Sequence, residues 1–189
     1  LGCSNANGRY LVFASGHVAP ITNNWLRNIV KPFQDSNVAM VYGRQRATNE
    51  NTLSEMRDLE CRYGTASNIL VDEAQANNGN SAVRRELWEK IPFDEALPGL
   101  EDVDWARKVE LLGYRVYYAA DAAVHHVHEE TLRQVYKRYE REAIAAKSMF
   151  PNFRFRWGDV LKGLPYSILQ DLEFGVRRRK FSKILGIPG

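Results

Sequence analysis

The sequence is poor in the features that identify several large classes of protein. It has only two cysteines, Cys3 and Cys61, which lie far apart and without the spacing of a metal site. We interpret them as reduced thiols of a cytoplasmic protein, with a single disulfide as the alternative. No apolar run approaches the ~20 residues that a membrane-spanning helix needs, and no signal peptide is visible.

The common nucleotide-binding and hydrolase motifs are also missing. The patterns GxxxxGK[ST], GxGxxG and GxSxG do not occur, so nucleotide hydrolysis, dinucleotide binding and α/β-hydrolase chemistry have no support. The basic residues do not form a recognisable nucleic-acid-binding module, and we expect no nucleic-acid partner. The 189 residues are enough for one domain with its own core.

Positive charge is concentrated near the end of the sequence. Residues 151–189 contain eight Lys or Arg against three Asp or Glu, a net charge of +5, whereas residues 1–150 carry a net charge of −2. We therefore divide the chain into a body, 1–150, and a basic amphipathic helical segment, 151–189. This segment either lies peripherally on the cytoplasmic face of the inner membrane or packs on the body as a helical hairpin with a solvated basic face.

Strand-like and helix-like patterns alternate through the body, which predicts an α/β fold. The strand-like runs are residues 9–15, 38–47 and 114–124, and the helical patterns are residues 22–34, 52–64 and 130–150. Residues 77–91 predict a turn, a short strand and then a helix. Thr52 and Glu55 have the spacing of a capping box.

An acidic stretch precedes and opens another predicted helix, which ends near Gly113. Residues 92–107, "PFDEALPGLEDVDWAR", hold five carboxylates among apolar residues. From Asp102, the positions 3, 4, 7 and 10 residues later are all apolar, so Asp102 heads the apolar stripe and points inward. Asp104 and Lys108 are placed to pair on a more polar flank. We expect Asp102 to face a cleft rather than to serve only the helix dipole.

Two further clusters could carry chemistry. "HHVH" places His126 and His128 on one side of an extended strand, a start for a divalent-metal site, although a pair of surface or hydrogen-bonded histidines fits equally well. Arg84 and Arg85 precede a helix and could meet a diphosphate, because guanidinium groups match phosphate oxygens. The other interpretation of these arginines is a solvated helix start.

Together these segments resemble the second half of a family 2 glycosyltransferase. The resemblance runs from about Gly8 to Ala146 and includes "GRYLVFASGHVAPITNNWL", "VYGRQ", "RYEREA" and the long segment from "NGNSAVRREL" through "GLEDVDWARKVELLGYRVYYAADAAVHHVH". It implies a partial GT-A fold, a Rossmann-like α/β domain that lacks its N-terminal βαβ half and is followed by C-terminal helices. It is most similar to the bacterial polysaccharide and rhamnosyltransferase-like branch.

The resemblance also implies roles for particular residues. Glu101 and Asp102 match the family's acidic motif, in which the Asp is the general base of an inverting transfer from a nucleotide-diphospho-sugar to an acceptor hydroxyl. Glu101 would orient that base or hold the acceptor, which is a glycan or a lipid-linked sugar. His126 or His128 matches the family's downstream His, which can complete a metal site, with His126 the closer match. Asn80 and Trp105 are assigned to the acceptor region.

This sequence departs from the family pattern in two places. The DxD metal motif should follow the strand "YLVF", but Ser15-Gly16-His17 stands there without a carboxylate. A Mg²⁺ or Mn²⁺ cofactor is therefore doubtful: either His17 binds a metal itself, or the diphosphate is held with little help from a metal. The family's nucleotide-binding half is not in this sequence, so we expect the chain to be part of a longer polypeptide and incomplete by itself.

Three hypotheses follow. The first is the inverting glycosyltransferase, a single-addition enzyme because the QxxRW signature of processive synthases is absent. The second is a non-catalytic module that retains the acceptor groove and the membrane segment. The third is a metal-dependent hydrolase that uses His17, His126 and His128, which requires the three imidazoles to converge.

Overall fold

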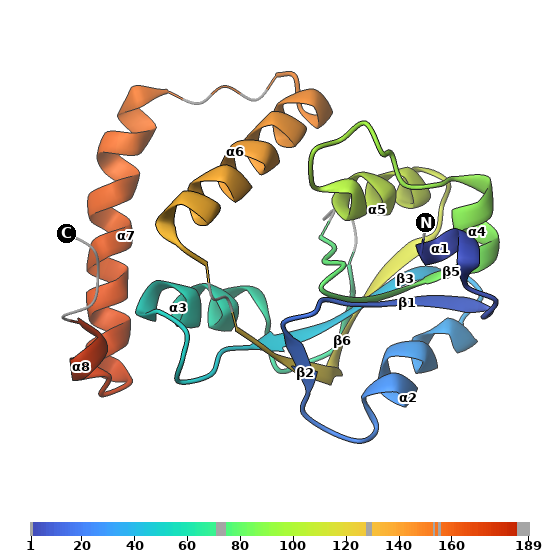
Figure 1. Cartoon of the computed structure of the whole chain (residues 1–189), viewed down its shortest axis with the longest axis horizontal. Helices are drawn as coiled ribbons and strands as arrows, with labels where there is room; N and C mark the ends of the chain where they lie inside the picture. The colour runs from blue at the N-terminus through green and yellow to red at the C-terminus, as the bar shows by residue number, and fades with distance from the viewer. Residues whose placement is uncertain (1, 71–74, 128–129, 153, 155, 185–189) are drawn as a thin grey trace.

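The computed structural model describes residues 2–70, 75–127, 130–152, 154, 156–184, and it forms one mixed sheet with helices on both faces (Figure 1). The sheet order is β1-β5-β3-β6-β2, and β4 also pairs with β6. The strands are β1 (Tyr10–Ala14), β2 (Val18–Pro20), β3 (Val38–Arg46), β4 (Asn68–Leu70), β5 (Asn80–Arg84) and β6 (Arg115–His126). β3 and β6 are parallel, while β5 lies antiparallel between β1 and β3.

The helices fall into three groups. On one face of the sheet lie α1 (Gly2–Asn5), α4 (Arg85–Lys90) and α5 (Glu101–Leu111), and on the other lie α2 (Trp25–Val30) and the 3-10 turn η1 (Lys31–Gln34). At one end of the sheet lie α3 (Leu53–Arg62), α6 (Leu132–Met149), α7 (Trp157–Arg177) and α8 (Phe181–Ile184). The α/β fold predicted from the alternating patterns is confirmed.

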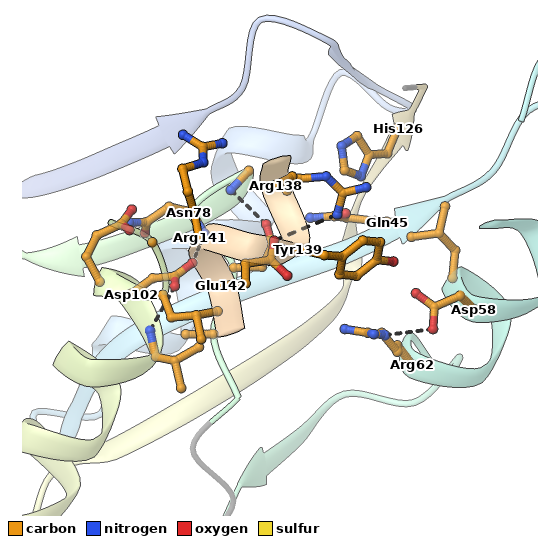
Figure 2. A pocket seen from close by; sticks show the side chains of 18 of the residues that line it. Gln45, Asp58, Arg62, Asn78, Asp102, His126, Arg138, Tyr139, Arg141 and Glu142 are labelled. Carbon is orange, nitrogen blue, oxygen red and sulfur yellow. Dashed lines mark hydrogen bonds and ion pairs between the residues drawn. The ribbon is translucent and has the colours of Figure 1, made fainter. Parts of the chain in front are cut away.

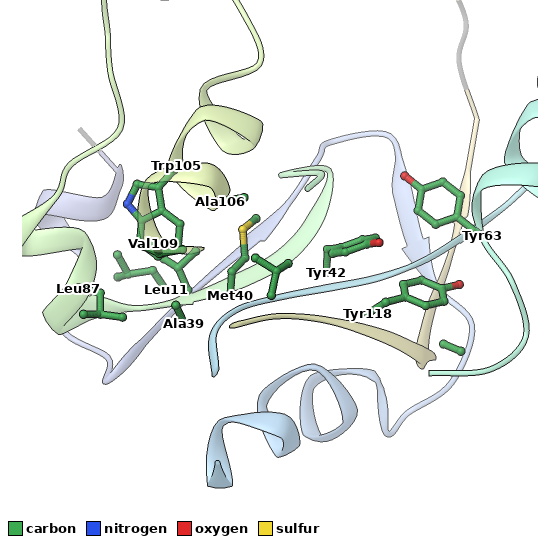
Figure 3. Packing of buried hydrophobic residues seen from close by; sticks show 13 residues of the cluster. Leu11, Ala39, Met40, Tyr42, Tyr63, Leu87, Trp105, Ala106, Val109 and Tyr118 are labelled. Atoms are coloured by element: carbon green, nitrogen blue, oxygen red, sulfur yellow. The ribbon is translucent and has the colours of Figure 1, made fainter. Parts of the chain in front are cut away.

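The larger hydrophobic core lies between the sheet and α5 (Figure 3). Trp105, Ala106 and Val109 of α5 are fully buried against Met40 and other strand residues, as the apolar stripe of that helix predicts. Lys108 pairs with Asp104 on the flank of the helix at 2.6 Å, also as predicted. This packing fixes the start of α5 over the end of the sheet.

The elements differ from the sequence-based expectations in a few places. The short strands β2 and β4 and the short helix α1 were not predicted. The helical pattern at 22–34 is divided into α2 and η1, because Pro32 has no N–H to continue an α-helix. The capping box of Thr52 and Glu55 is present, with the Thr52 side chain accepting from the Glu55 N–H.

The segment after residue 150 packs partly on the body. Asp171 of α7 is buried, pairs with Arg57 of α3 at 2.7 Å and accepts a hydrogen bond from Ser54 at 2.7 Å. α8 turns back against α7 near Gly175. Helix packing on the body, one of the two expectations for this segment, therefore occurs in the C-terminal half of α7.

Candidate active site

Several chain segments meet at one edge of the sheet because β3 and β6 run parallel. Their carboxyl ends lie together, and β5, which runs the other way, begins at the same edge. Ligand sites in open α/β sheets form at such edges. A pocket of about 510 Å³ opens there between the loop 77–79, the start of α5, the end of β6, and α3 and α6 (Figure 2).

Asp102 lines this pocket at the first turn of α5. Its Oδ2 accepts a hydrogen bond from the Asn78 N–H at 2.7 Å, and its Oδ1 accepts one from the Val103 N–H at 2.8 Å. Burial raises the pKa of the Asp102 carboxyl, the two backbone donors oppose that rise, and the charge of Glu101 adds to it. The carboxylate is therefore held in one orientation and binds a proton more tightly than an exposed Asp, as a general base requires.

The predicted histidine neighbour of this carboxylate is also in the pocket. His126, at the end of β6, and Glu101 both line it. His126 is almost fully buried, and its ring stacks on that of His17 with centroids 4.7 Å apart and planes at 15°. The pairing of β2 with β6, which sets Val18 opposite His126, brings His17 to this place. Ser15 Oγ lies 3.0 Å from His17 Nδ1.

This arrangement does not fit a resident divalent metal. Ring-nitrogen lone pairs lie in the ring plane, so stacked imidazoles direct them side by side rather than toward one ion. Within the described part of the chain, no group of three or more His, Cys, Asp or Glu side chains could hold a metal. His128 lies outside the described residues. The described histidines therefore lack the convergence that the hydrolase hypothesis requires.

The two arginines proposed for the diphosphate lie elsewhere. Arg84 is 4% exposed, and its guanidinium donates to the carbonyl oxygens of Phe33, Asp35 and Val38 at 2.6–2.8 Å. Arg85 forms an ion pair with Glu89 one turn along α4. Neither is among the described residues that line the pocket. The fold uses Arg84 to satisfy backbone carbonyls, which corrects its assignment as a phosphate ligand.

The two residues assigned to the acceptor region are structural as well. Asn80 is fully buried, accepts a hydrogen bond from the Trp25 indole at 2.8 Å and donates to the Ala122 carbonyl at 2.8 Å. Trp105 has no exposed surface and donates to the Ile91 carbonyl at 2.6 Å. Asn80 holds α2 to the sheet and Trp105 fills the core, so neither is available to an acceptor.

Other residues of the pocket were not assigned from the sequence. α6 contributes Arg138, Tyr139 and Arg141, and β3 contributes Gln45 (Figure 2). Arg138 is held by Glu130 at 3.0 Å and by Glu142 at 3.7 Å. The segments "VYGRQ" and "RYEREA", which contain these residues, could have pointed to them because both belong to the family resemblance. Only the fold shows that the two segments border the same pocket.

Comparison with known proteins identifies the same family over most of the chain. Residues 2–145 match the family model described as "Glycosyltransferase like family 2". The chain is 29% identical over 140 residues to the O-antigen chain rhamnosyltransferase WbaN of Salmonella anatum, and 27% identical over 140 residues to RfbN of Salmonella typhimurium. These alignments cover 69% and 68% of this chain but 44% of each relative, so the chain spans less than half the length of the curated relatives it matches.

Solved structures share the fold as well. The mannosyltransferase PcManGT from Pyrobaculum calidifontis, in complex with GDP-Man and Mn²⁺, matches with a TM-score of 0.56 at 16% identity, over 99% of this chain and 53% of its own. GalNAc-T7 with UDP, GalNAc and Mn²⁺ matches with a TM-score of 0.52 at 15% identity, over 90% of this chain and 39% of its own. Both likenesses concern the fold alone. The pocket at the sheet edge, the acidic helix start and the matched family model lead to one conclusion: the chain belongs to glycosyltransferase family 2 and forms part of a GT-A domain.

Proposed function

We propose that the full-length protein transfers a sugar from a nucleotide-diphospho-sugar to a hydroxyl group of a glycan acceptor, with Asp102 as general base. The observation that carries the proposal is the Asp102 carboxylate, held by two backbone N–H groups at the wall of the pocket at the sheet edge. The rhamnosyltransferase names of the curated relatives support a rhamnosyl or related hexosyl donor. The words "O-antigen chain" in those names support a polysaccharide or lipid-linked acceptor.

The transfer is a single displacement in this proposal. The acceptor oxygen attacks the anomeric carbon as its proton passes to Asp102, while the bond from that carbon to the donor phosphate breaks and the nucleoside diphosphate leaves. Attack opposite the leaving group inverts the configuration at the anomeric carbon. Glu101, at the same wall, orients the acceptor or the base. Arg141 lines the pocket and offsets the negative charge that develops on the leaving group, whereas Arg138 is already paired with Glu130 and Glu142.

The proposed transfer does not include a divalent cation. The structural neighbours contain Mn²⁺ beside a nucleotide or nucleotide-sugar, which supports cation use in proteins of this fold. The family resemblance implies that Ser15 and His17 stand in place of metal-binding carboxylates, and the described side chains do not form a metal site. No step of the proposed transfer is therefore assigned to a metal.

The chemistry is tested by Asp102→Asn in the full-length protein. The amide keeps the shape and can still accept from the Asn78 N–H, but it cannot take the acceptor proton. We expect the rate of transfer to fall by about 10²–10⁴-fold with unchanged folding, the usual contribution of a general base. Asp104→Asn is the matched control, because Asp104 lies on the same helix and pairs with Lys108 on its flank. Undiminished transfer by Asp102→Asn would refute the assignment.

The replacement of the metal-binding carboxylates by Ser15-Gly16-His17 favours one competing function, a non-catalytic glycan-binding module. Calorimetric titration of the full-length protein with nucleotide-sugars separates the two. Donor binding supports the transferase, whereas the absence of both donor binding and donor hydrolysis supports the module.

The same proposal includes peripheral contact of residues 151–189 with an anionic membrane surface on the cytoplasmic side. α3 covers only one side of α7, through residues such as Ser167, Gln170 and Asp171. The uncovered apolar side chains include Trp157, Leu161, Leu164 and Leu169, each 61–84% exposed. Basic residues lie near both ends of the helix, as suits contact with acidic headgroups. No described helix is both long and apolar enough to cross a bilayer.

A further inference from the structure

A second hollow, of about 470 Å³, adjoins the candidate active site. It lies where the end of β3 meets α3 and the residue that follows α7, and it shares Gln45, Leu59 and Tyr63 with the active-site pocket. A ligand could therefore extend from one hollow to the other. We call it the arginine hollow, after the residues Arg44, Arg46 and Arg178 in its wall.

The arginine hollow has an excess of positive charge. Among the described residues that line the hollow, Glu60 is the acidic one, and it pairs with Arg178. Arg44 Nε is buried and has no hydrogen-bond partner among the described residues, and Arg46 is exposed. Within the described residues neither Arg44 nor Arg46 forms an ion pair, so both guanidinium groups can meet an anion from outside the chain.

Gln45 gives an independent indication that a ligand belongs here. Its side chain is 2% exposed and borders both hollows, and its Nε2 has no hydrogen-bond partner within the described part of the chain. A buried donor without a partner costs free energy and is uncommon in native proteins. A ligand oxygen at the junction of the two hollows would satisfy it.

We propose that the arginine hollow binds a phosphate or diphosphate group of a substrate, with Arg44 and Arg46 as its cationic ligands and Gln45 as a neutral donor. Guanidinium groups recognise phosphate through paired, charge-assisted hydrogen bonds. This inference rests on the proposed transferase, whose donor contains a diphosphate and whose acceptor can carry one on a lipid. Arg178 directly follows α7, whose exposed apolar side chains include Val176, so the lipid-borne source is tested explicitly.

The experiment is calorimetric titration of the full-length protein with inorganic pyrophosphate. We expect Arg44→Gln and Arg46→Gln each to weaken binding by roughly tenfold, the loss of one charge-assisted hydrogen bond, and the double variant to flatten the salt dependence. Arg27→Gln is the matched control, because it removes one positive charge on α2, at the opposite face of the sheet. If Arg44→Gln impairs folding, the exposed Arg46→Glu tests the same charge without disturbing the core.

Three further probes, farnesyl diphosphate, UDP and GDP, identify the source of the phosphate. Weakened binding of farnesyl diphosphate with unchanged binding of UDP and GDP assigns the hollow to a lipid-borne acceptor, and the reverse pattern assigns it to the donor. Wild-type protein that does not bind pyrophosphate, or a double variant that binds it as tightly as wild type, would overturn the proposal. Pyrophosphate binding and sugar transfer are separate measurements, so a failure of the transfer mechanism and a failure of the phosphate site give different results.

Discussion

At the scale of single residues, burial decides which polar side chains can serve a substrate. Asp102 and Arg84 were both candidates from the sequence, but Asp102 is half-buried and Arg84 is only 4% exposed. The Asp102 carboxylate accepts hydrogen bonds from two backbone N–H groups and still lines the pocket. The Arg84 guanidinium donates its hydrogen bonds to backbone carbonyl oxygens inside the fold. The half-buried Asp102 is thus a candidate base at the pocket, whereas the buried Arg84 has a structural role.

The raised pKa of Asp102 predicts the pH dependence of transfer. Only the ionised carboxylate can accept the proton, so kcat/KM should fall as the pH drops through a pKa above the ordinary Asp value of ~3.9. A raised folded-state pKa also means that this group's contribution to stability is complete below the unfolded-state pKa and is lost as the pH rises through the folded-state pKa. The check is a pH–rate profile with a parallel series of unfolding midpoints. A profile whose acidic limb lies at or below the ordinary Asp value contradicts the assignment.

For Arg84 we predict an effect on stability rather than on transfer. Arg84→Met leaves three carbonyl oxygens without their donor, and we expect the free energy of unfolding to fall by about 3 kcal/mol or more. Urea denaturation of the purified protein measures the change. Arg85→Met is the matched control, because the exposed Arg85–Glu89 pair is worth only ~0.5 kcal/mol. Equal effects of the two substitutions would show that the buried contacts of Arg84 contribute little.

At the scale of elements, the attachment of α7 depends on one largely buried ion pair. Asp171→Ala leaves the mostly buried Arg57 without its carboxylate, and we expect a loss of about 3 kcal/mol together with detachment of α7 from α3. Hydrogen exchange of the amides in 157–177 should rise in this variant. Glu173→Ala, which breaks the exposed pair with Arg177, should leave the exchange unchanged. If exchange in α7 is the same in both variants, contacts other than this ion pair attach the helix.

At the scale of the whole molecule, charge and apolar surface are separated between the body and the C-terminal segment. If residues 151–189 lie on an anionic membrane, the protein should sediment with phosphatidylglycerol vesicles and much less with phosphatidylcholine vesicles, with roughly 1 kcal/mol per basic residue at the surface. Leu161→Asp with Leu164→Asp should abolish binding without disturbing the α3 contact. Binding that is insensitive to salt and to these substitutions would exclude the proposed surface.

Much of this protein could be predicted from its sequence because the relevant interactions are local. The period of apolar residues identified the strands at 38–47 and 114–124 and the acidic helix. The apolar stripe below Asp102 indicated which carboxylate turns inward. The capping box at Thr52 depends on residues three positions apart, and it too is present. These features involve neighbours along one element, and sequence spacing determines them directly.

The tertiary structure alone decided which distant residues share a site. Nothing local distinguishes Arg84, which donates to backbone carbonyls, from Arg44, whose buried Nε has no hydrogen-bond partner in the described part of the chain. Likewise, only the parallel pairing of β3 with β6 brings Gln45 beside His126 and the loop before β5. Burial and pocket membership depend on contacts between segments up to ~100 residues apart, and such contacts exist only once the chain has folded.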